Sequence, residues 1–491
     1  MRKVKEIIND FVRLKPPIFI VILFLSIPFV IFFQKEFKFD NDFWFLINTG
    51  KYIINKGIPH IEPFTIHSNL SFVAQQWLTD IIFYLIYNKF NIHGMYIFII
   101  ISNIIIVYLL YKISILINEK KRKLSILTTL IIVFHYMALF SVTRPQVFDI
   151  ILLLLELYLL ELYIKRNNKK YLLGLPIISL LMINLHASVW PMIFVFLLPY
   201  YMGKINLKFT TKESYKLKPL IIVTIVMLLF GFINPYGLES MTYLFKSYGI
   251  EQIDKIVNEM APLTIKNGII IYIYILFIII TYVINRNNKV NLRYTLLLLG
   301  TTLLSLQHIK GELFFLISST IVINYNLKDI FFEEIKECNV NINKYIKISL
   351  IILLCTIILI SFKNKKYIKE EANELYEIVK ILKDNKAESS TIYTGYDAGS
   401  YIEYQGFKCY IDPRAEVFLK SNNKKEDIFI EYYNLQTGKI NIKNFVEKYK
   451  FDYIIIDNYE SILHTYIDEL DGYTQIYNKN DELKLYKRIE E

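Results

Sequence analysis

The chain has 491 residues, 54% of them hydrophobic, and a mean hydropathy of +0.35. A soluble core cannot bury that much apolar surface, so the composition excludes an ordinary soluble protein and predicts a polytopic α-helical membrane protein. The formal net charge is +11, but the basic residues form short clusters between apolar runs, which argues against nucleic acid as a partner. The three cysteines are scattered without a CxxC pair, so neither a disulfide framework nor a zinc site is predicted.

Apolar runs recur along the first 362 residues. Roughly 17–25 apolar residues suffice to cross a bilayer, and shorter runs suffice where a helix tilts or is buried. On this basis we predict about eleven transmembrane helices. They lie near residues 16–33, 95–117, 124–142, 146–164, 171–186, 189–203, 219–234, 268–285, 294–307, 312–326 and 345–362.

The basic clusters orient these spans. Lysine and arginine concentrate at cytoplasmic ends of membrane helices, and here they gather at every second end. The N-terminus is therefore predicted to be cytoplasmic, and the segment after the last span to be extracytoplasmic. The clusters are at the N-terminus and at residues 120–123, 165–170, 204–218 and 286–293.

The first outer loop, residues 34–94, is about sixty residues long, and a loop of that length without structure is improbable. Residues 42–55 have helical spacing of apolar side chains, and Gly57-Ile58-Pro59 ends the pattern. Residues 76–88 predict a second helix, which leads into the next span. Both are expected to lie at the membrane interface.

The composition becomes soluble after Phe362, which predicts a division into a transmembrane domain, residues 1–362, and a tail domain, residues 363–491. The tail is long enough to form its own core. Its pattern predicts a small α/β domain that begins with a charged amphipathic helix. That helix is expected at 363–386, and strands are expected at 390–393, 408–411 and 453–457.

Two carboxylates stand at the start of the first outer loop, in Phe39-Asp40-Asn41-Asp42-Phe43-Trp44. Asp42, assisted by Asp40, could take the proton from an acceptor hydroxyl during transfer of a sugar from a lipid-linked phosphate. The pair could instead hold a divalent cation, Mg²⁺ or Mn²⁺, on the leaving phosphate. The alternative is that both are solvated caps of the following helix, because Asp is a favoured N-cap.

Charged residues at other outer span junctions could complete such a site. Arg144 could grip a phosphate bidentately, and His308 and Lys310 could neutralise a phosphate leaving group. The alternatives are an arginine that anchors the helix at the interface and a lysine that snorkels. His186 closes an outward span, and Glu259 is a third carboxylate candidate in a later outer loop.

An ordered set of motifs resembles a group of bacterial multi-pass proteins that look like GT-C glycosyltransferases. Each motif is short, but the set is spread along nearly the whole chain. The motifs are Asp42 to Leu46 with Gly50, Gly57-Ile58-Pro59, Pro63-Phe64-Thr65, Gln76-Trp77-Leu78, Arg144-Pro145-Gln146, Asn184-Leu185-His186, Asn234 to Gly237, Glu259 with Pro262, Gln307 to Lys310, Tyr396 to Tyr401 and Ile411 to Ala415.

The wider superfamily includes protein O-mannosyltransferases and lipid A aminoarabinose transferases. The resemblance implies a polyprenyl-phosphate-sugar donor and a first-loop aspartate as catalytic base, which matches Asp42. Within its motifs, Trp44 and Trp77 are expected to contribute to substrate binding. The chain departs from the pattern at Gln76, where an acidic residue is common, and at Gln307, where Arg is usual. Phe45 also stands where the pattern has a second aromatic residue followed by His.

The sequence thus favours an inverting membrane glycosyltransferase that acts on a glycan, lipid or protein acceptor at the outer face of the plasma membrane. In the tail, Asp412 and Arg414 at a strand end are expected to help bind the acceptor, with a local ion pair as the alternative. The competing hypothesis is a non-catalytic or transport component of cell-envelope polysaccharide or lipid assembly. Such a component would line a mid-membrane path with charges, whereas here polar residues gather at one face.

Overall fold

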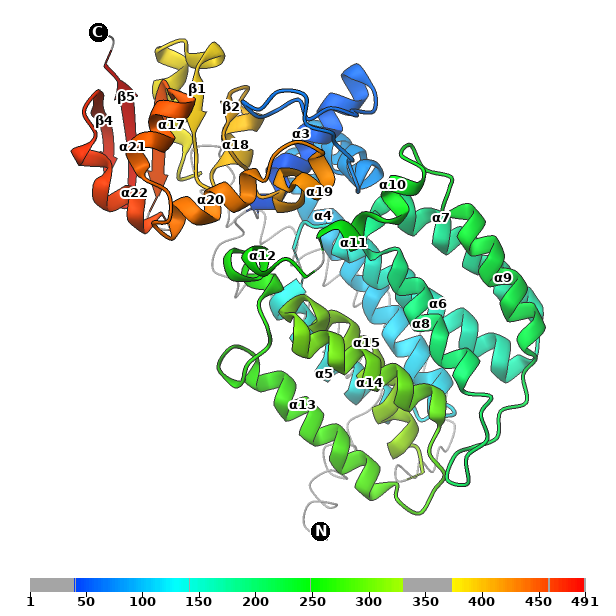
Figure 1. Ribbon diagram of the computed structural model, residues 1–491. Coiled ribbons are helices and arrows are strands. Elements are labelled where there is room, and N and C mark those ends of the chain that lie inside the picture. The colour runs from blue at the N-terminus through cyan, green and yellow to red at the C-terminus, as the bar shows by residue number, and fades with distance from the viewer. Residues whose placement is uncertain are drawn as a thin grey trace.

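A computed structural model describes Phe39 and residues 41–140, 142–247, 249–329, 373–457 and 460–489. Within these residues the chain forms a bundle of helices and, at one end of it, a small domain built on a β-sheet (Figure 1). The predicted spans 16–33 and 345–362 lie outside the described residues, and so do Asp40 and residues 363–372 of the predicted tail helix.

The helices of the bundle coincide with the other nine predicted spans. The central helices pack closely, with α4 against α5 and α6, and α15 against α5, α13 and α14. Their bounds are α4 Trp77–Ile117, α5 Arg122–Phe140, α6 Gln146–Arg166, α7 Leu175–Leu185, α8 Pro191–Met202, α9 Leu217–Phe230, α13 Ile265–Ile284, α14 Leu292–Gln307 and α15 Glu312–Leu327.

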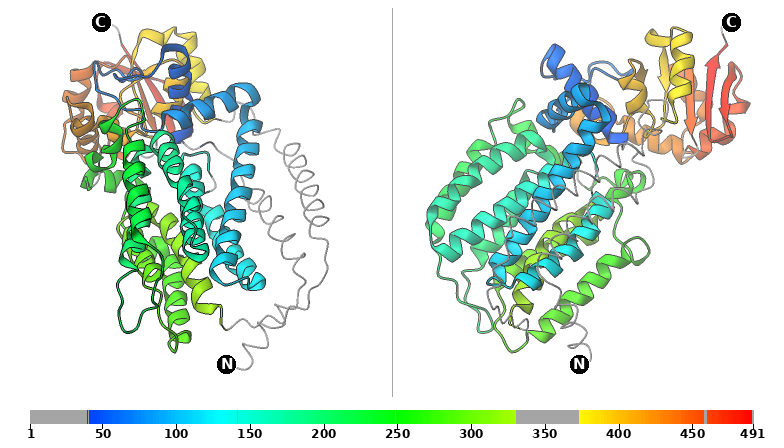
Figure 2. Two further views of the ribbon diagram at one scale, coloured as in Figure 1. Left: turned by 90° about the vertical axis from the view of Figure 1, so that its right-hand side faces the viewer. Right: turned by 180° about the vertical axis from the view of Figure 1, so that it is seen from behind.

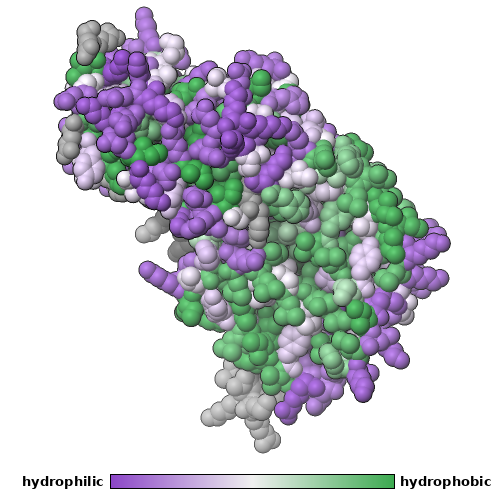
Figure 3. Space-filling model, in the orientation of Figure 1, coloured by the Kyte–Doolittle hydropathy of each residue, from purple (hydrophilic) through white to green (hydrophobic). Residues whose placement is uncertain are grey.

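Among the described helices, α4 and α13 are both long enough and apolar enough to cross a membrane. Helix α7 has 11 residues, or about 16 Å at 1.5 Å per residue, which is roughly half the thickness of a hydrocarbon layer. Apolar side chains cover much of the outer surface of the bundle (Figure 3). On α13, Ile273 and Leu276 are each 59% exposed. Apolar exposure on this scale favours a membrane environment.

The predicted helix at 42–55 is present as α3, Asn41–Lys56. It ends at Gly57, whose φ of +86° is a conformation that glycine adopts without strain and whose N–H bonds to the Ile53 carbonyl at 2.9 Å. Gly50 faces α4 so closely that a Cβ there would lie 2.1 Å from the Asp80 carbonyl oxygen. A glycine at this position therefore allows α3 to pack directly on the start of α4.

The predicted helix at 76–88 is the first part of α4. The helix bends at Asn91, which has φ 51° and ψ −152°, and continues into the predicted span at 95–117. Short helices join the longer ones. The helix η1 Lys169–Gly174 connects the end of α6 to the start of α7, and the others are η2 Ala187–Val189, α10 Leu238–Met241, α11 Tyr243–Ser247, α12 Glu251–Ile256, η3 Asn258–Met260 and η4 Ile309–Gly311.

The tail domain contains a five-stranded sheet in the order β2-β1-β3-β5-β4. Strands β2, β1 and β3 are parallel and confirm the three predicted strands, whereas β5 and β4 form an antiparallel hairpin that the pattern did not predict. The strands are β1 Thr391–Tyr393, β2 Lys408–Cys409, β3 Tyr453–Asp457, β4 Tyr473–Lys479 and β5 Leu483–Arg488. The helices are α17 Tyr376–Asp384, η7 Ala387–Ser389, α18 Gly399–Tyr404, η8 Ala415–Phe418, α19 Lys420–Asn423, α20 Ile428–Gln436, α21 Ile442–Tyr449, α22 Ser461–Tyr466 and η9 Ile467–Glu469.

The loop between α3 and α4 joins the tail domain to the bundle. Thr65 forms a parallel bridge with Cys409 of β2, and the Ile66 N–H bonds to the Cys409 carbonyl at 3.0 Å. Leu70 and Phe72 of this loop belong to the tail's hydrophobic core, and α18 packs against α3. The further views show the tail domain and α3 at the same end of the bundle (Figure 2). This end is where the predicted site residues meet.

Candidate functional site

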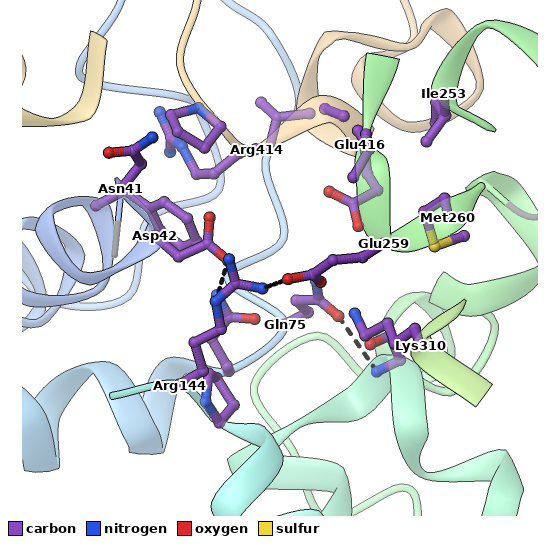
Figure 4. A pocket seen from close by; sticks show the side chains of 18 of the residues that line it. Asn41, Asp42, Gln75, Arg144, Ile253, Glu259, Met260, Lys310, Arg414 and Glu416 are labelled. Carbon is purple, nitrogen blue, oxygen red and sulfur yellow. Dashed lines mark hydrogen bonds and ion pairs between the residues drawn. The ribbon is translucent and has the colours of Figure 1, made fainter. Parts of the chain in front are cut away.

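A cavity of about 700 Å³ lies where the bundle, the α3–α4 loop and the tail domain come together. This volume is within the range of small-molecule sites in proteins. Its walls come from segments more than 300 residues apart in the chain, and Figure 4 shows several of the side chains. Seven of the predicted site residues line it: Asp42, Arg144, His186, Glu259, His308, Lys310 and Arg414.

Arg144 lies between two carboxylates at the centre of this cavity (Figure 4). Its Nε is 3.2 Å from Asp42 Oδ2, and its Nη1 donates to Glu259 Oε1. Asp42 is in the first turn of α3, where a helix N-terminus favours negative charge, and Glu259 is in η3. The guanidinium is largely buried, with 14% exposure, whereas Asp42 retains 27%. Asp42 is therefore accessible from the cavity and is held beside a fixed positive charge.

His186 is oriented by a carboxylate that the sequence analysis did not single out. Its Nδ1 is 2.7 Å from Oδ2 of Asp149, in the first turn of α6. Both side chains are buried, and His186 lines the cavity while Asp149 does not. A carboxylate partner fixes the ring orientation and favours the tautomer with the proton on Nδ1. The arrangement can therefore present the other ring nitrogen to a bound ligand.

His308 and Lys310 supply positive charge or hydrogen-bond donors on the opposite wall. The His308 Nδ1 is 2.6 Å from the Met260 carbonyl, so this nitrogen carries a proton and donates. Lys310 lies two residues later in η4 and makes no ion pair among the residues that the structure describes. An ammonium in this position is suited to an anionic ligand.

The two predicted tryptophans lie outside the cavity lining. Trp44 is buried in an aromatic cluster with ring contacts to Tyr87, Tyr401 and Tyr404. The Trp77 Nε1–H donates to Asn184 Oδ1 at 2.9 Å and so holds the start of α4 against the end of α7. Both residues shape the surroundings of the cavity, which differs from the substrate contact predicted for them.

Asp412 and Arg414 form the local ion pair that was the alternative to acceptor binding. The Arg414 Nε donates to both oxygens of Asp412 at 2.9 and 3.0 Å, and its Nη2 donates to Glu62 Oε1 at 2.8 Å. Asp412 is fully buried and does not line the cavity, whereas Arg414 does. Because Glu62 belongs to the α3–α4 loop, this pair fixes that loop to the tail domain.

Comparisons with known proteins bear on the fold. No family model matches the chain, and no curated protein matches it either. Among solved structures, it matches the crystal structure of the Archaeoglobus fulgidus oligosaccharyltransferase tethered through a disulfide bond to an acceptor peptide containing the NVT sequon. The TM-score is 0.58 at 11% sequence identity, and the match covers 93% of this chain and 70% of that chain.

The chain has a GT-C-like fold. The match spans both the helical bundle and the tail domain, because it leaves only a small part of this chain uncovered. It supports the predicted resemblance at the level of architecture. The cavity lies at the junction of the two parts that make up this fold.

Several polar residues of the cavity escaped the sequence analysis as site candidates. Asp80 lies one helical turn after Gln76, both line the cavity, and Asp80 Oδ1 has no hydrogen-bond partner among the described residues. Gln307 is exposed and does not line it. Asp80 could have been found from the helix predicted at 76–88, since positions i and i+4 share a face. Four further carboxylates come from the tail: Asp397, Glu416, Asp457 and Glu460.

The cation predicted at Asp40 and Asp42 stays a prediction, because Asp40 lies outside the described residues. Among them no group of three or more His, Cys, Asp or Glu side chains is placed to hold an ion. Asp42 faces the guanidinium of Arg144, and a cation bound to this carboxylate would be repelled by that fixed charge.

We expect Glu403 of α18 to make the stability of the tail depend on pH. Its carboxyl is buried near Arg414, with Oε2 and Nη2 3.7 Å apart, and neither oxygen has a hydrogen bond within the described residues. Burial, with repulsion from Asp412, raises its pKa well above 4.5. Above about pH 4.5 the folded state thus binds more protons than the unfolded state, so the free energy of unfolding falls as pH rises toward the folded pKa.

Replacing Glu403 with Gln should remove this dependence. At pH 8 the variant is expected to unfold at a temperature higher by about 4 °C, the shift that about 1 kcal/mol produces in a domain of this size. At pH 4.5 and below the two proteins should converge. Thermal unfolding at both pH values checks this, with exposed Glu447→Gln as the matched control. A variant that is equally stabilised at both values would contradict the ionisation argument.

Proposed function

We propose that the chain is a membrane glycosyltransferase that moves a sugar from a polyprenyl-phosphate carrier to an acceptor hydroxyl. The observation that carries the proposal is the lining of one cavity by Asp42 together with Arg144, His308 and Lys310. A carboxylate, a guanidinium, an ammonium and an imidazole in one cavity match the two charges that the reaction must handle. The GT-C-like fold supports the same class of reaction.

In the proposed reaction Asp42 accepts the proton of the acceptor hydroxyl. The oxygen attacks the anomeric carbon from the side opposite the phosphate, and the bond from this carbon to the phosphate oxygen breaks. The electron pair of that bond leaves with the phosphate, whose added negative charge is stabilised by Arg144, His308 and Lys310. Attack from the opposite side inverts the anomeric configuration.

Arg144 is placed to contact both the carboxylate of Asp42 and the departing phosphate. In the ligand-free protein its guanidinium binds Asp42 through one edge and Glu259 through another. A phosphate could replace Glu259 at this guanidinium. The carboxylate is planar and the phosphate is tetrahedral, but each has two oxygens that can accept a pair of N–H bonds from arginine. Glu259 is 40% exposed and lies in a short helix, so it can move aside with a smaller desolvation change than Asp42.

The proposed topology follows the charge pattern. The protein would cross the plasma membrane several times, with its N-terminus in the cytoplasm and its tail domain and cavity on the extracytoplasmic side. The bilayer would deliver the lipid part of the donor to the rim of the cavity. Exposed apolar surface on the bundle and polar surface on the tail domain support this arrangement (Figure 3).

Replacing Arg144 with Lys tests the proposed phosphate contact. The variant keeps the charge but loses the planar pair of donors, so kcat/KM for a polyprenyl-phosphate sugar should fall about 10- to 100-fold. The measurement is transfer of radiolabelled sugar in membranes that contain equal amounts of each protein. Arg286→Lys, at an exposed position after α13, is the control. A value of kcat/KM within twofold of wild type would contradict the contact.

A further inference from the structure

The tail domain contributes one end of the cavity through the carboxyl ends of its parallel strands. In the sheet, β2 and β3 lie on opposite sides of β1, so the chain changes direction at β1. Ligands of open α/β sheets bind outside the carboxyl ends of strands at such a position. Here Tyr396 and Asp397 follow β1, Asp457 ends β3, and all three line the cavity.

Glu460 has an unsatisfied hydrogen-bonding atom in this part of the cavity. The side chain is 1% exposed, and its Oε1 accepts hydrogen bonds from the Tyr393 hydroxyl at 2.6 Å and the Gln436 amide at 3.1 Å. Its Oε2 has no partner among the described residues, although Glu460 lines the cavity. A buried carboxyl oxygen without a partner is costly and is usually satisfied by a ligand or water.

The groups around Glu460 suit sugar hydroxyls. Gln436 and Tyr432 also line the cavity, and the Tyr432 hydroxyl accepts the Tyr396 N–H at 3.3 Å. Carboxyl, amide and phenol groups can each donate or accept, as a sugar hydroxyl can. Burial raises the pKa of the Glu460 carboxyl, and a hydroxyl can pair with either its charged or its neutral form.

This end of the cavity is continuous with the proposed catalytic end. Asp42, Tyr396 and Glu460 all line the same cavity. The Tyr396 hydroxyl donates to the Pro413 carbonyl at 2.6 Å, which fixes the ring beside Arg414. A ligand held at Glu460 can therefore extend past Tyr396 toward Asp42.

An extended polypeptide fits this end less well than a glycan. Peptides commonly bind by adding a strand to a free sheet edge. The β2 edge of this sheet is already paired with Thr65 and Ile66 of the α3–α4 loop. The other edge, β4, is not part of the cavity wall.

We propose that Glu460, with Gln436 and Tyr432, binds a sugar residue of a glycan acceptor and directs one of its hydroxyls to Asp42. The inference rests on the proposed function and names the acceptor class for the same cavity. Glu460 is assigned to acceptor binding, whereas the donor phosphate is assigned to Arg144, His308 and Lys310. The two assignments can therefore fail separately.

The test measures binding of the purified full chain to an array of neutral oligosaccharides and, in parallel, to an array of Ser-, Thr- and Asn-containing tripeptides. Wild type is expected to bind at least one oligosaccharide, and Glu460→Ala should bind it about tenfold more weakly or worse, because a buried hydrogen bond is lost. Exposed Glu447→Ala is the matched control and should bind as wild type.

A second variant tests the role of the Glu460 carboxyl while keeping this carboxyl, which accepts a hydrogen bond from the Tyr393 hydroxyl, in the protein. A Cβ at Gly395 would lie 2.7 Å from Cδ of Glu460 and 3.0 Å from each of its carboxyl oxygens. Gly395→Ala should therefore displace this carboxyl and also weaken oligosaccharide binding. Thermal unfolding of each variant shows that the protein remains folded.

The possible outcomes separate the two proposals. Wild-type binding to tripeptides alone, or to neither array, overturns the glycan assignment. Oligosaccharide binding that is unchanged in both Glu460→Ala and Gly395→Ala overturns the position of the site. Asp42→Asn should keep oligosaccharide binding while losing transfer, so a failure at Asp42 contradicts the catalytic proposal and leaves the acceptor site standing.

Discussion

Replacing Asp42 with Asn is expected to lower sugar transfer by about 10²- to 10⁴-fold, the usual contribution of a positioned general base. The amide has nearly the same shape but cannot take a proton from the acceptor hydroxyl. Its contact with Arg144 is partly exposed, so losing the ion pair should change the stability of the fold by no more than about 1 kcal/mol. The loss should therefore appear in kcat and not in the amount of protein in the membrane.

The measurement is turnover of a radiolabelled polyprenyl-phosphate sugar in membranes, with the protein level checked by immunoblot. Asp471→Asn is a matched control, because Asp471 is an exposed aspartate of the tail domain that does not line the cavity. Retained turnover in Asp42→Asn would remove the proposed base. The same assay on Glu259→Gln distinguishes the two carboxylates that bind Arg144, since Glu259 is assigned no proton transfer.

Local pattern was enough to predict most helices. The spacing of apolar residues and the stop at Gly57-Ile58-Pro59 predicted α3 within one residue at each end. The break between the predicted spans 171–186 and 189–203 is present at η2, but α7 starts four residues later than predicted, because η1 occupies Lys169–Gly174. Hydropathy alone does not distinguish a 3-10 turn from the start of an α-helix in an apolar run.

The β4–β5 hairpin was missed although a local signal was present. Most residues of β4 are exposed, and both strands contain charged residues. The alternation of apolar and polar residues that marks a strand is therefore weak. The turn, however, is Asn480-Asp481, with φ of 53° and 57°, and the Glu482 N–H bonds to the Lys479 carbonyl at 2.9 Å. Two residues with positive φ between strands are typical of a type I′ hairpin, for which Asn and Asp are favoured.

The cavity could be predicted only in part. Charged residues at the predicted outer ends of spans included Asp42, Arg144, His308 and Lys310, which line one cavity, whereas their roles stay a prediction. The pairing of Asp149 with His186, and the arrival of Glu460 from the tail, depend on contacts between distant segments. No periodicity in one segment specifies such contacts, and the sheet order that brings β1 and β3 to the cavity was not predicted.

Arg414→Met is the change expected to destabilise the tail domain most. The guanidinium is 6% exposed and binds Asp412 and Glu62, which are both buried, with the rings of Phe64 and Phe72 each 5.2 Å from it. Methionine fills similar space but leaves these carboxylates without a counter-charge. Removing one member of a buried ion pair typically costs 3–5 kcal/mol, a large part of the stability of a domain.

The loss should loosen the α3–α4 loop around Glu62, which binds Arg414, although Thr65 and Ile66 still pair with β2. Limited proteolysis is expected to cut this loop in Arg414→Met under conditions in which wild type is intact, and the unfolding temperature of the tail should fall by more than 10 °C. Exposed Arg488→Met, which loses one hydrogen bond to the Lys450 carbonyl, is the control. If Arg414→Met unfolds within 2 °C of this control, the buried cluster does not join the loop to the tail, and acceptor binding becomes the better explanation of Arg414.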